Sequence, residues 1–123
     1  MRDVTVTFGR PGTSVTARWL TTPLQRLRGL LLTGRDARPV LLEGCASVHT
    51  FGMAYPIDVA FLGHDGTCLL SVRGMRPGRV LGARGSRRVL ERPAADGPWP
   101  QRGERVEMTC GRGGGGSPPR ERA

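Results

Sequence analysis

Residues 57–73, with the sequence IDVAFLGHDGTCLLSVR, decide the fold. Residues 57–62 alternate between two sets of side chains and are rich in β-branched and aromatic types, which is typical of a strand. Asp65-Gly66 is a pair that favours a tight two-residue hairpin turn. Residues 68–73 are again apolar and are expected to return as a second strand. The stretch therefore predicts an antiparallel β-hairpin in the middle of the chain.

The rest of the chain shows the same kind of pattern in shorter pieces. Five further strands are predicted, at residues 4–8, 15–19, 40–43, 88–91 and 105–108. One short helix is expected, with Thr22 as its cap, Pro23 in its first turn and Gly34 as its stop. About seven short strands and one helix predict a mainly β fold, a compact β-sandwich or a small barrel.

The length and composition fit a single domain. The chain has 123 residues, 37% of them hydrophobic, enough for one compact core over residues 1–110. Residues 111–123, GRGGGGSPPRERA, have nothing to bury and are expected to be a disordered tail. No apolar run approaches the roughly 20 residues that cross a bilayer. The start of the sequence lacks a secretory signal, so a cytoplasmic location is expected.

The basic residues are unevenly placed. All 19 are arginine, and the formal net charge is +9. Within residues 73–92 only one acid, Glu91, accompanies the seven arginines that we call the basic stripe: Arg73, Arg76, Arg79, Arg84, Arg87, Arg88 and Arg92. Such a stripe could attract phosphates or acidic proteins, or it could be an ordinary solvated surface. No aromatic residue interleaves with it, so at most weak, salt-labile nucleic-acid binding is expected.

Several motifs resemble the bacterial and archaeal family known as domain of unknown function 192. The positions that carry the resemblance are Arg26, Gly29, Leu30, Met53, Pro56, Ile57, Asp58, Leu90 and Glu91. The resemblance covers roughly residues 3–108 and implies a compact, mainly β domain with one short helix. It implies no established activity, cofactor or substrate. The sequence departs from the family pattern at residues 92–97.

Asp58 is the most unusual of the candidate site residues, because it lies in an apolar strand. Burying a carboxylate costs several kcal/mol unless it is paired or hydrogen bonded. Arg26, Arg28 or backbone N–H groups could satisfy it, and a structural ion pair is the favoured interpretation. The functional alternative is a polar group at the floor of a ligand pocket. The residues of that candidate pocket are His49, Met53, Asp58, Glu91, Arg26 and Arg28.

The sequence gives less support to a metal site or to a cysteine nucleophile than to the candidate pocket. The spacing of Cys45, His49, His64 and Cys68 suggests zinc at first sight. On a strand, however, Cys45 and His49 would lie about 13 Å apart, too far to share an ion. No cofactor or metal is therefore expected, and the three cysteines are expected to be reduced thiols. A cysteine nucleophile with His49 as base lacks a visible activating group.

Three classes of function stay open on this basis. The favoured one is a non-catalytic β domain that binds a small molecule or a protein partner. The second is an arginine-driven binder of nucleic acid or of an acidic partner. The third is an enzyme that uses Asp58 and His49, since a carboxylate beside a histidine can do acid–base work. No motif in the sequence specifies a reaction.

Overall fold

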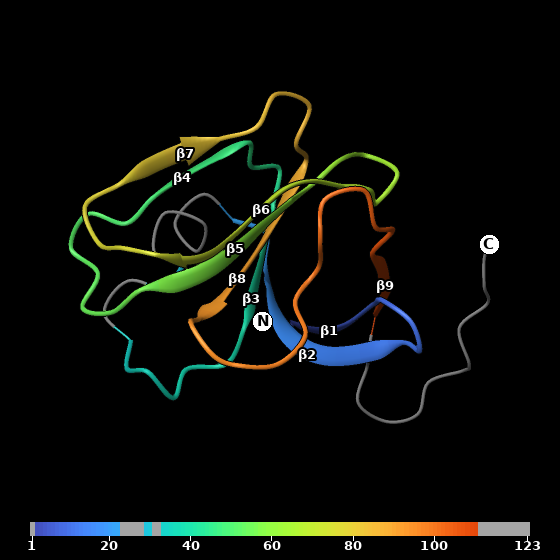
Figure 1. Cartoon of the computed structure of the whole chain (residues 1–123), viewed down its shortest axis with the longest axis horizontal. Coiled ribbons are helices and arrows are strands. Elements are labelled where there is room, and N and C mark those ends of the chain that lie inside the picture. The colour runs from blue at the N-terminus through green and yellow to red at the C-terminus, as the bar shows by residue number, and fades with distance from the viewer. Residues whose placement is uncertain (1, 23–28, 31–32, 111–123) are drawn as a thin grey trace.

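The computed structural model describes residues 2–22, 29–30 and 33–110, and every regular element in them is a strand (Figure 1). The strands are β1 (Arg2–Phe8), β2 (Thr13–Leu20), β3 (Val40–Glu43), β4 (Ser47–His49), β5 (Ile57–Leu62), β6 (Cys68–Met75), β7 (Val80–Gly82), β8 (Arg88–Pro93) and β9 (Glu107–Cys110). The predicted mainly β fold is confirmed. The predicted helix and the predicted tail fall largely or wholly outside the described residues. The described residues contain no helix that could cross a membrane.

Seven strands form one sheet that curls into a half-barrel, in the order β6-β5-β8-β3-β2-β1-β9 (Figure 1). The pairing is antiparallel except between β2 and β3. β4 and β7 form a separate two-stranded sheet. The segment that leads into β9 reaches the start of β6, where Cys68 N donates to Glu104 O at 2.8 Å and Gly103 N donates to Cys68 O at 2.8 Å. These bonds link the two edges of the curled sheet at one end.

The large sheet is buried on both faces. The tryptophan core lies against one face and contains Val4, Val6, Phe8, Ala17, Leu41, Ala60, Leu62, Cys68, Leu90, Trp99 and Val106. The tyrosine core lies against the other and contains Leu20, Leu30, Val40, Leu42, Val48, Tyr55, Ile57, Val59, Phe61, Met75 and Val89. Because successive side chains of a strand point to opposite faces, β5 supplies residues to both cores. All six of its residues are buried.

The predicted strand boundaries hold best where the strands are central. Residues 40–43 and 57–62 match β3 and β5, whereas the last strand lies at Glu107–Cys110 and not at 105–108. β4 and β7 were not predicted. Each has three residues. In each strand the middle side chain, Val48 or Leu81, is less exposed than its two neighbours, and these two side chains face each other across the pair. Three residues are too few for an alternating pattern to stand out.

The central hairpin is confirmed, but its turn is one residue longer than predicted. Gly63 N donates to Thr67 O at 2.8 Å, which leaves His64, Asp65 and Gly66 as the loop. Gly66 has φ +91°, and a Cβ added to it would lie 2.4 Å from Val106 O. Val106 N also donates to Gly66 O at 2.8 Å. Only glycine fits there, because the turn is tied closely to the segment before β9.

Replacing Gly66 with alanine should therefore cost more than its backbone conformation alone. Gly78 is the matched control, since it has φ +83° with nothing within 4 Å of an added Cβ. We expect Gly78→Ala to cost about 1 kcal/mol of unfolding free energy, and Gly66→Ala about 2 to 4 kcal/mol because the backbone must also shift. Urea unfolding of the two variants measures the difference. Equal losses would show that the contact with Val106 does not matter.

Candidate functional site

Asp58 is the better satisfied of two buried acids on the central strands. It is 1% exposed, and its carboxylate accepts from Gly74 N at 2.9 Å, Arg92 Nε at 2.8 Å and Ala95 N at 3.3 Å. The ion pair follows from register, since Asp58 on β5 lies directly opposite Arg92 on β8. The expected backbone donors are present. Arg26 and Arg28, the expected charged partners, lie outside the described residues, and the ion pair that the structure shows is with Arg92.

Arg92 joins this ion pair to the loop that follows β8. Its guanidinium also donates to Ala95 O at 3.1 Å and Pro98 O at 3.2 Å, and it lies 4.5 Å from the ring centroid of Trp99. Trp99 in turn meets the ring of Phe8 edge-on at 6.5 Å. The charges and hydrogen bonds of Asp58 are thus used to hold the loop over the tryptophan core. This is a structural role.

Removing the charge of Asp58 should destabilise the fold. In Asp58→Asn the buried guanidinium of Arg92 loses its counter-charge, so we expect a loss of about 2 to 3 kcal/mol in unfolding free energy. The matched control is Asp3→Asn, because the Asp3–Arg38 pair is about half exposed on both sides and should contribute little. Denaturant unfolding compares the two. Equal stability of both variants would contradict a structural role for Asp58.

Glu91 is buried on the same strand as Arg92 but faces the tyrosine core. It is 5% exposed and lies between Val40 of β3 and Val59 of β5. No residue in the described part of the chain donates a hydrogen bond to its carboxyl. Burial in this apolar setting raises the pKa of Glu91 to about 7. The acid is therefore largely neutral below that pH and becomes an uncompensated buried charge above it.

The raised pKa predicts a loss of stability as the pH rises. The folded chain keeps the Glu91 proton up to about pH 7, whereas the unfolded chain loses it near pH 4.5, so unfolding becomes easier between these values and stays easier above them. Glu91→Gln, which mimics the neutral acid, should be more stable than wild type by about 3 kcal/mol at pH 8 and by under about 1 kcal/mol at pH 5. Urea unfolding at both pH values tests this. Glu107→Gln, at an exposed site on β9, should show no such dependence.

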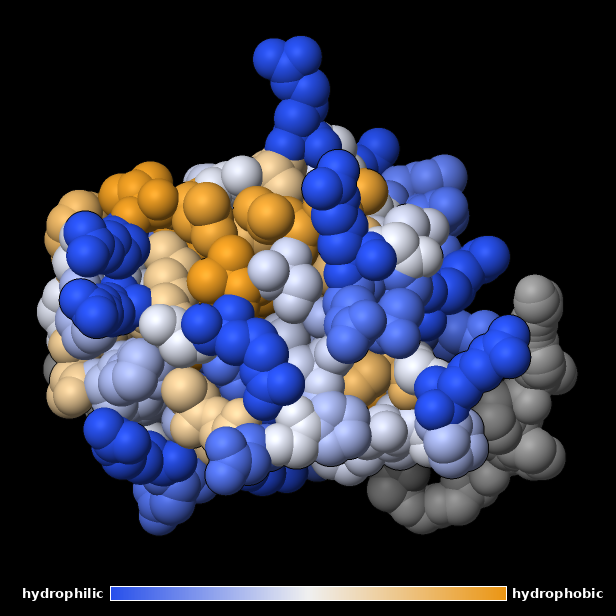
Figure 2. Space-filling model, in the orientation of Figure 1, coloured by the Kyte–Doolittle hydropathy of each residue, from blue (hydrophilic) through white to orange (hydrophobic). Residues whose placement is uncertain are grey.

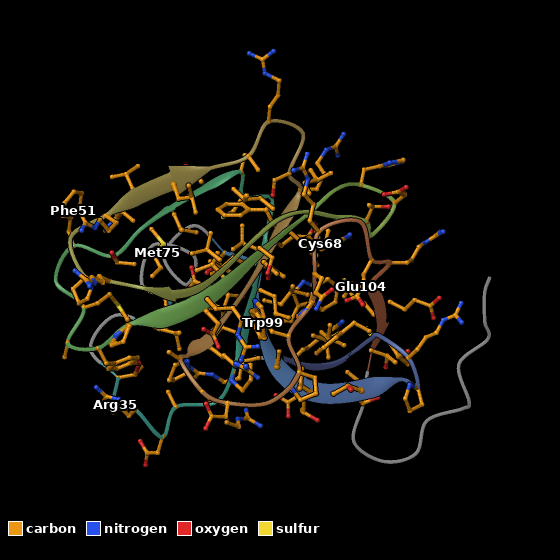
Figure 3. All side chains as sticks on the ribbon, in the orientation of Figure 1. Arg35, Phe51, Cys68, Met75, Trp99 and Glu104 are labelled. Atoms are coloured by element: carbon orange, nitrogen blue, oxygen red, sulfur yellow. The ribbon has the colours of Figure 1, made fainter. Side chains whose placement is uncertain are left out.

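The remaining candidate pocket residues do not gather around Asp58. Met53 is half-buried and packs against the tyrosine core, on the same side of the sheet as Glu91. His49 is exposed on β4, where its ring stacks on Phe51 at 5.5 Å and its Nδ1 accepts from Phe51 N at 3.3 Å. Figure 3 shows Phe51 at the outer margin of the molecule. The structure does not join His49 to Asp58.

The thiol of Cys68 is not activated as a nucleophile. Cys68 is buried and its Sγ donates to Leu70 O at 3.5 Å, and burial raises the pKa of its thiol, which keeps it protonated. Cys45 is half-buried and Cys110 is exposed. Over residues 2–22, 29–30 and 33–110, no three His, Cys, Asp or Glu side chains come close enough together to hold a metal ion.

An exposed apolar corner is the feature that the sequence did not reveal. Phe51 and Val80 are 55% and 65% exposed, and they are the large hydrophobic side chains left most open among the described residues. They are neighbours in the fold because His49, two residues before Phe51, pairs with Val80 between β4 and β7. A strand of three residues gave no signal for this pairing. We call Phe51, Val80 and the exposed Arg76 and Arg79 the corner surface.

Thr50 fixes the backbone of the corner surface. It is fully buried, and its hydroxyl donates to Arg76 O at 2.6 Å and accepts from Arg79 N at 2.8 Å. Its own N–H donates to Arg79 O at 2.8 Å, and its carbonyl accepts from Gly78 N at 3.0 Å. These bonds hold the 76–79 loop beside residues 49–51, so the exposed side chains project from an ordered backbone.

The basic stripe divides into two groups in the structure. Three of its arginines serve the fold: Arg73 donates to Ala95 O and Gly97 O, Arg88 pairs with Glu43 at 2.7 Å, and Arg92 pairs with Asp58. The other four are exposed and make no ion pair with any described residue: Arg76, Arg79, Arg84 and Arg87. Fewer cations are available for a partner than the sequence suggests.

Comparison with known proteins identifies the fold. The chain matches no protein-family model and no curated protein sequence. It is similar to the crystal structure of a "putative transcription regulator" from Sinorhizobium meliloti 1021, with a TM-score of 0.73, 21% identity and coverage of 88% of this chain and 94% of that one. It is also similar to a protein of unknown function from Novosphingobium aromaticivorans DSM 12444, with a TM-score of 0.66, 21% identity and coverage of 85% and 83%. At this identity the likeness shows the fold alone.

Proposed function

We propose that this β domain is a non-catalytic binding module that takes an acidic, partly apolar segment of a partner protein at the corner surface. The observation that carries the proposal is the exposure of Phe51 and Val80 on a backbone fixed by Thr50, with Arg76 and Arg79 beside them. Figure 2 shows apolar surface gathered over β7 and the neighbouring part of β6, with hydrophilic residues around it.

The chemistry of the corner surface favours a protein over other partners. Aromatic and arginine side chains are the types that contribute most to protein–protein affinity, usually at the centre of a contact patch. The partly buried Leu70, Val72 and Leu81 extend the apolar area behind the exposed pair. A formal charge of +9 would steer an acidic segment to this face and would repel a basic one.

The resemblance of the sequence motifs to the domain of unknown function 192 family is part of the same proposal. The motif pairs Ile57-Asp58 and Leu90-Glu91 lie on adjacent strands, where Ala60 faces Leu90 and Val59 faces Glu91. Two motifs far apart in sequence thus build one central strand pair, which supports a distant membership of that family. A cytoplasmic location stays a prediction.

A binder of nucleic acid is the second candidate. It is favoured by the four unpaired stripe arginines and by the name of the similar Sinorhizobium meliloti protein. With at most four cations for phosphates, the logarithm of the binding constant should fall with a slope of about 4 or less against the logarithm of salt concentration. The exposed apolar pair has no role in such backbone contacts, and this is why the protein partner is preferred.

A displayed library of short peptides built from acidic and apolar residues tests the proposal. We expect selection on the full chain to yield peptides whose affinity falls at least tenfold in Phe51→Ser and severalfold in Arg79→Gln, because both side chains would lie inside the contact. Arg10→Gln is the matched control, since it removes the same charge from the exposed β1–β2 turn. It should leave affinity nearly unchanged.

Two results would overturn this assignment. One is the absence of any library peptide that distinguishes wild type from Phe51→Ser. The other is binding of duplex or single-stranded DNA that persists at physiological salt and is lost in Arg84→Gln or Arg87→Gln, which would promote nucleic acid to the first candidate. Binding isotherms for the peptides and for both forms of DNA, at low and physiological salt, decide between them.

A further inference from the structure

The two buried acids of the central strands are treated very differently by their surroundings. Asp58 is met by three donors, Gly74 N, Arg92 Nε and Ala95 N. Glu91 is buried almost as completely, yet none of the described residues donates to it. Most buried polar groups in folded proteins have a partner, so an unpartnered carboxyl that is 5% exposed calls for a physical reason.

A purely structural reason does not account for Glu91. It sits between Val40 and Val59, where an apolar side chain would pack without any desolvation cost. Its carboxyl holds no loop and joins no strands in the part of the chain that the structure describes. At neutral pH we therefore expect the fold to be less stable with this acid than with a neutral residue of the same shape. Costs of this kind are typical of positions that serve binding.

The side chain of Glu91 is not completely closed off from solvent, since the residue is 5% exposed. Among the described residues, the one polar side-chain atom that is sealed from solvent without a hydrogen bond is Trp99 Nε1, in the other core. The oxygens of Glu91 have no donor either, so they keep a small solvent contact. Partly buried side chains border the same core, among them Met53 and Leu81. A small molecule that displaced solvent at this point would meet one acid in an apolar surrounding.

We propose that Glu91 is the polar anchor of a small-molecule site at the tyrosine core, and that the site takes a small organic cation, such as a primary amine with an apolar body. An ammonium group would supply the missing hydrogen-bond donors and the missing counter-charge together, and the low local dielectric would strengthen the pair. The body of the ligand would lie against the aliphatic side chains. None of the four residues of the corner surface belongs to this site, although Leu81 borders both.

Within residues 2–22, 29–30 and 33–110, the other charged and titratable groups around this core do not pair with Glu91. The hydroxyl of Tyr55 is already hydrogen bonded to Thr33 at 2.5 Å. Cys45 borders the core and is half-buried. No arginine among the described residues forms an ion pair with Glu91. The positive charge of the whole chain opposes the approach of a cation, and this repulsion between exposed charges and the ligand weakens as the salt concentration rises.

Titration of the full-length chain with primary amines of increasing apolar size, from n-butylamine to cyclohexylamine and benzylamine, tests the proposal. NMR chemical-shift changes would give dissociation constants at pH 6 and pH 8. We expect at least one amine to bind saturably, and to bind about tenfold more tightly at pH 8 than at pH 6. The reason is that Glu91, with its pKa of about 7, is mostly neutral at the lower pH and mostly ionised at the higher one.

Control variants and an uncharged control ligand distinguish binding at Glu91 from nonspecific binding elsewhere on the chain. Glu91→Gln should weaken amine binding more than tenfold and remove its pH dependence, whereas Glu107→Gln and Phe51→Ser should leave both unchanged. Benzyl alcohol, which has the shape of benzylamine without its charge, should bind at least tenfold more weakly at pH 8. The proposal is overturned if no amine of the series saturates, if Glu91→Gln binds as wild type does, or if the alcohol binds as well as the amine. A failure here would leave the corner surface untouched.

Discussion

The ion pair between Asp58 and Arg92 is the interaction on which the rest of the tryptophan core depends. It joins the adjacent strands β5 and β8, and the same guanidinium donates to carbonyls of the loop after β8 and lies against Trp99. Trp99 of that loop packs in the same core as Val4, Val6 and Leu90. A charged pair is costly to bury. Here each carboxylate oxygen of Asp58 accepts at least one hydrogen bond, from β6, from β8 or from the loop after β8.

Each of the two buried faces of the sheet carries one acid, and the two acids have different surroundings. On the tryptophan side, the acid is saturated with donors and serves stability. On the tyrosine side, Glu91 has no donor among the described residues. The small sheet of β4 and β7 covers this core through Val48 and Leu81. The alternation that builds both cores also places one acid in each. A single shift in register would exchange these environments.

The sequence predicted the central strands because they follow a period of two over six residues, and it placed Asp58 correctly as a buried acid that needs partners. It did not identify Arg92, because the pairing joins residues 34 positions apart, and no local pattern reports which strands become neighbours. Glu91 was recognised through its motif but was grouped with Asp58, whereas adjacent strands send the two to opposite faces. The corner surface stayed hidden because its two strands have three residues each.

The basic stripe shows why counting charges in a sequence overstates what a surface offers. Arg73 and Arg92 fasten the same loop after β8, and Arg88 is paired with Glu43, which also accepts from Trp19 Nε1 at 3.0 Å. These guanidinium groups are already paired with carboxylates or hydrogen bonded to backbone carbonyls. They are therefore not available to bind phosphates or carboxylates of a partner. The arginines that remain lie in the two loops flanking β7, and two of them border exposed apolar side chains. In the proposed function, placement beside Phe51 and Val80, more than net charge, would select an acidic partner that also carries apolar groups.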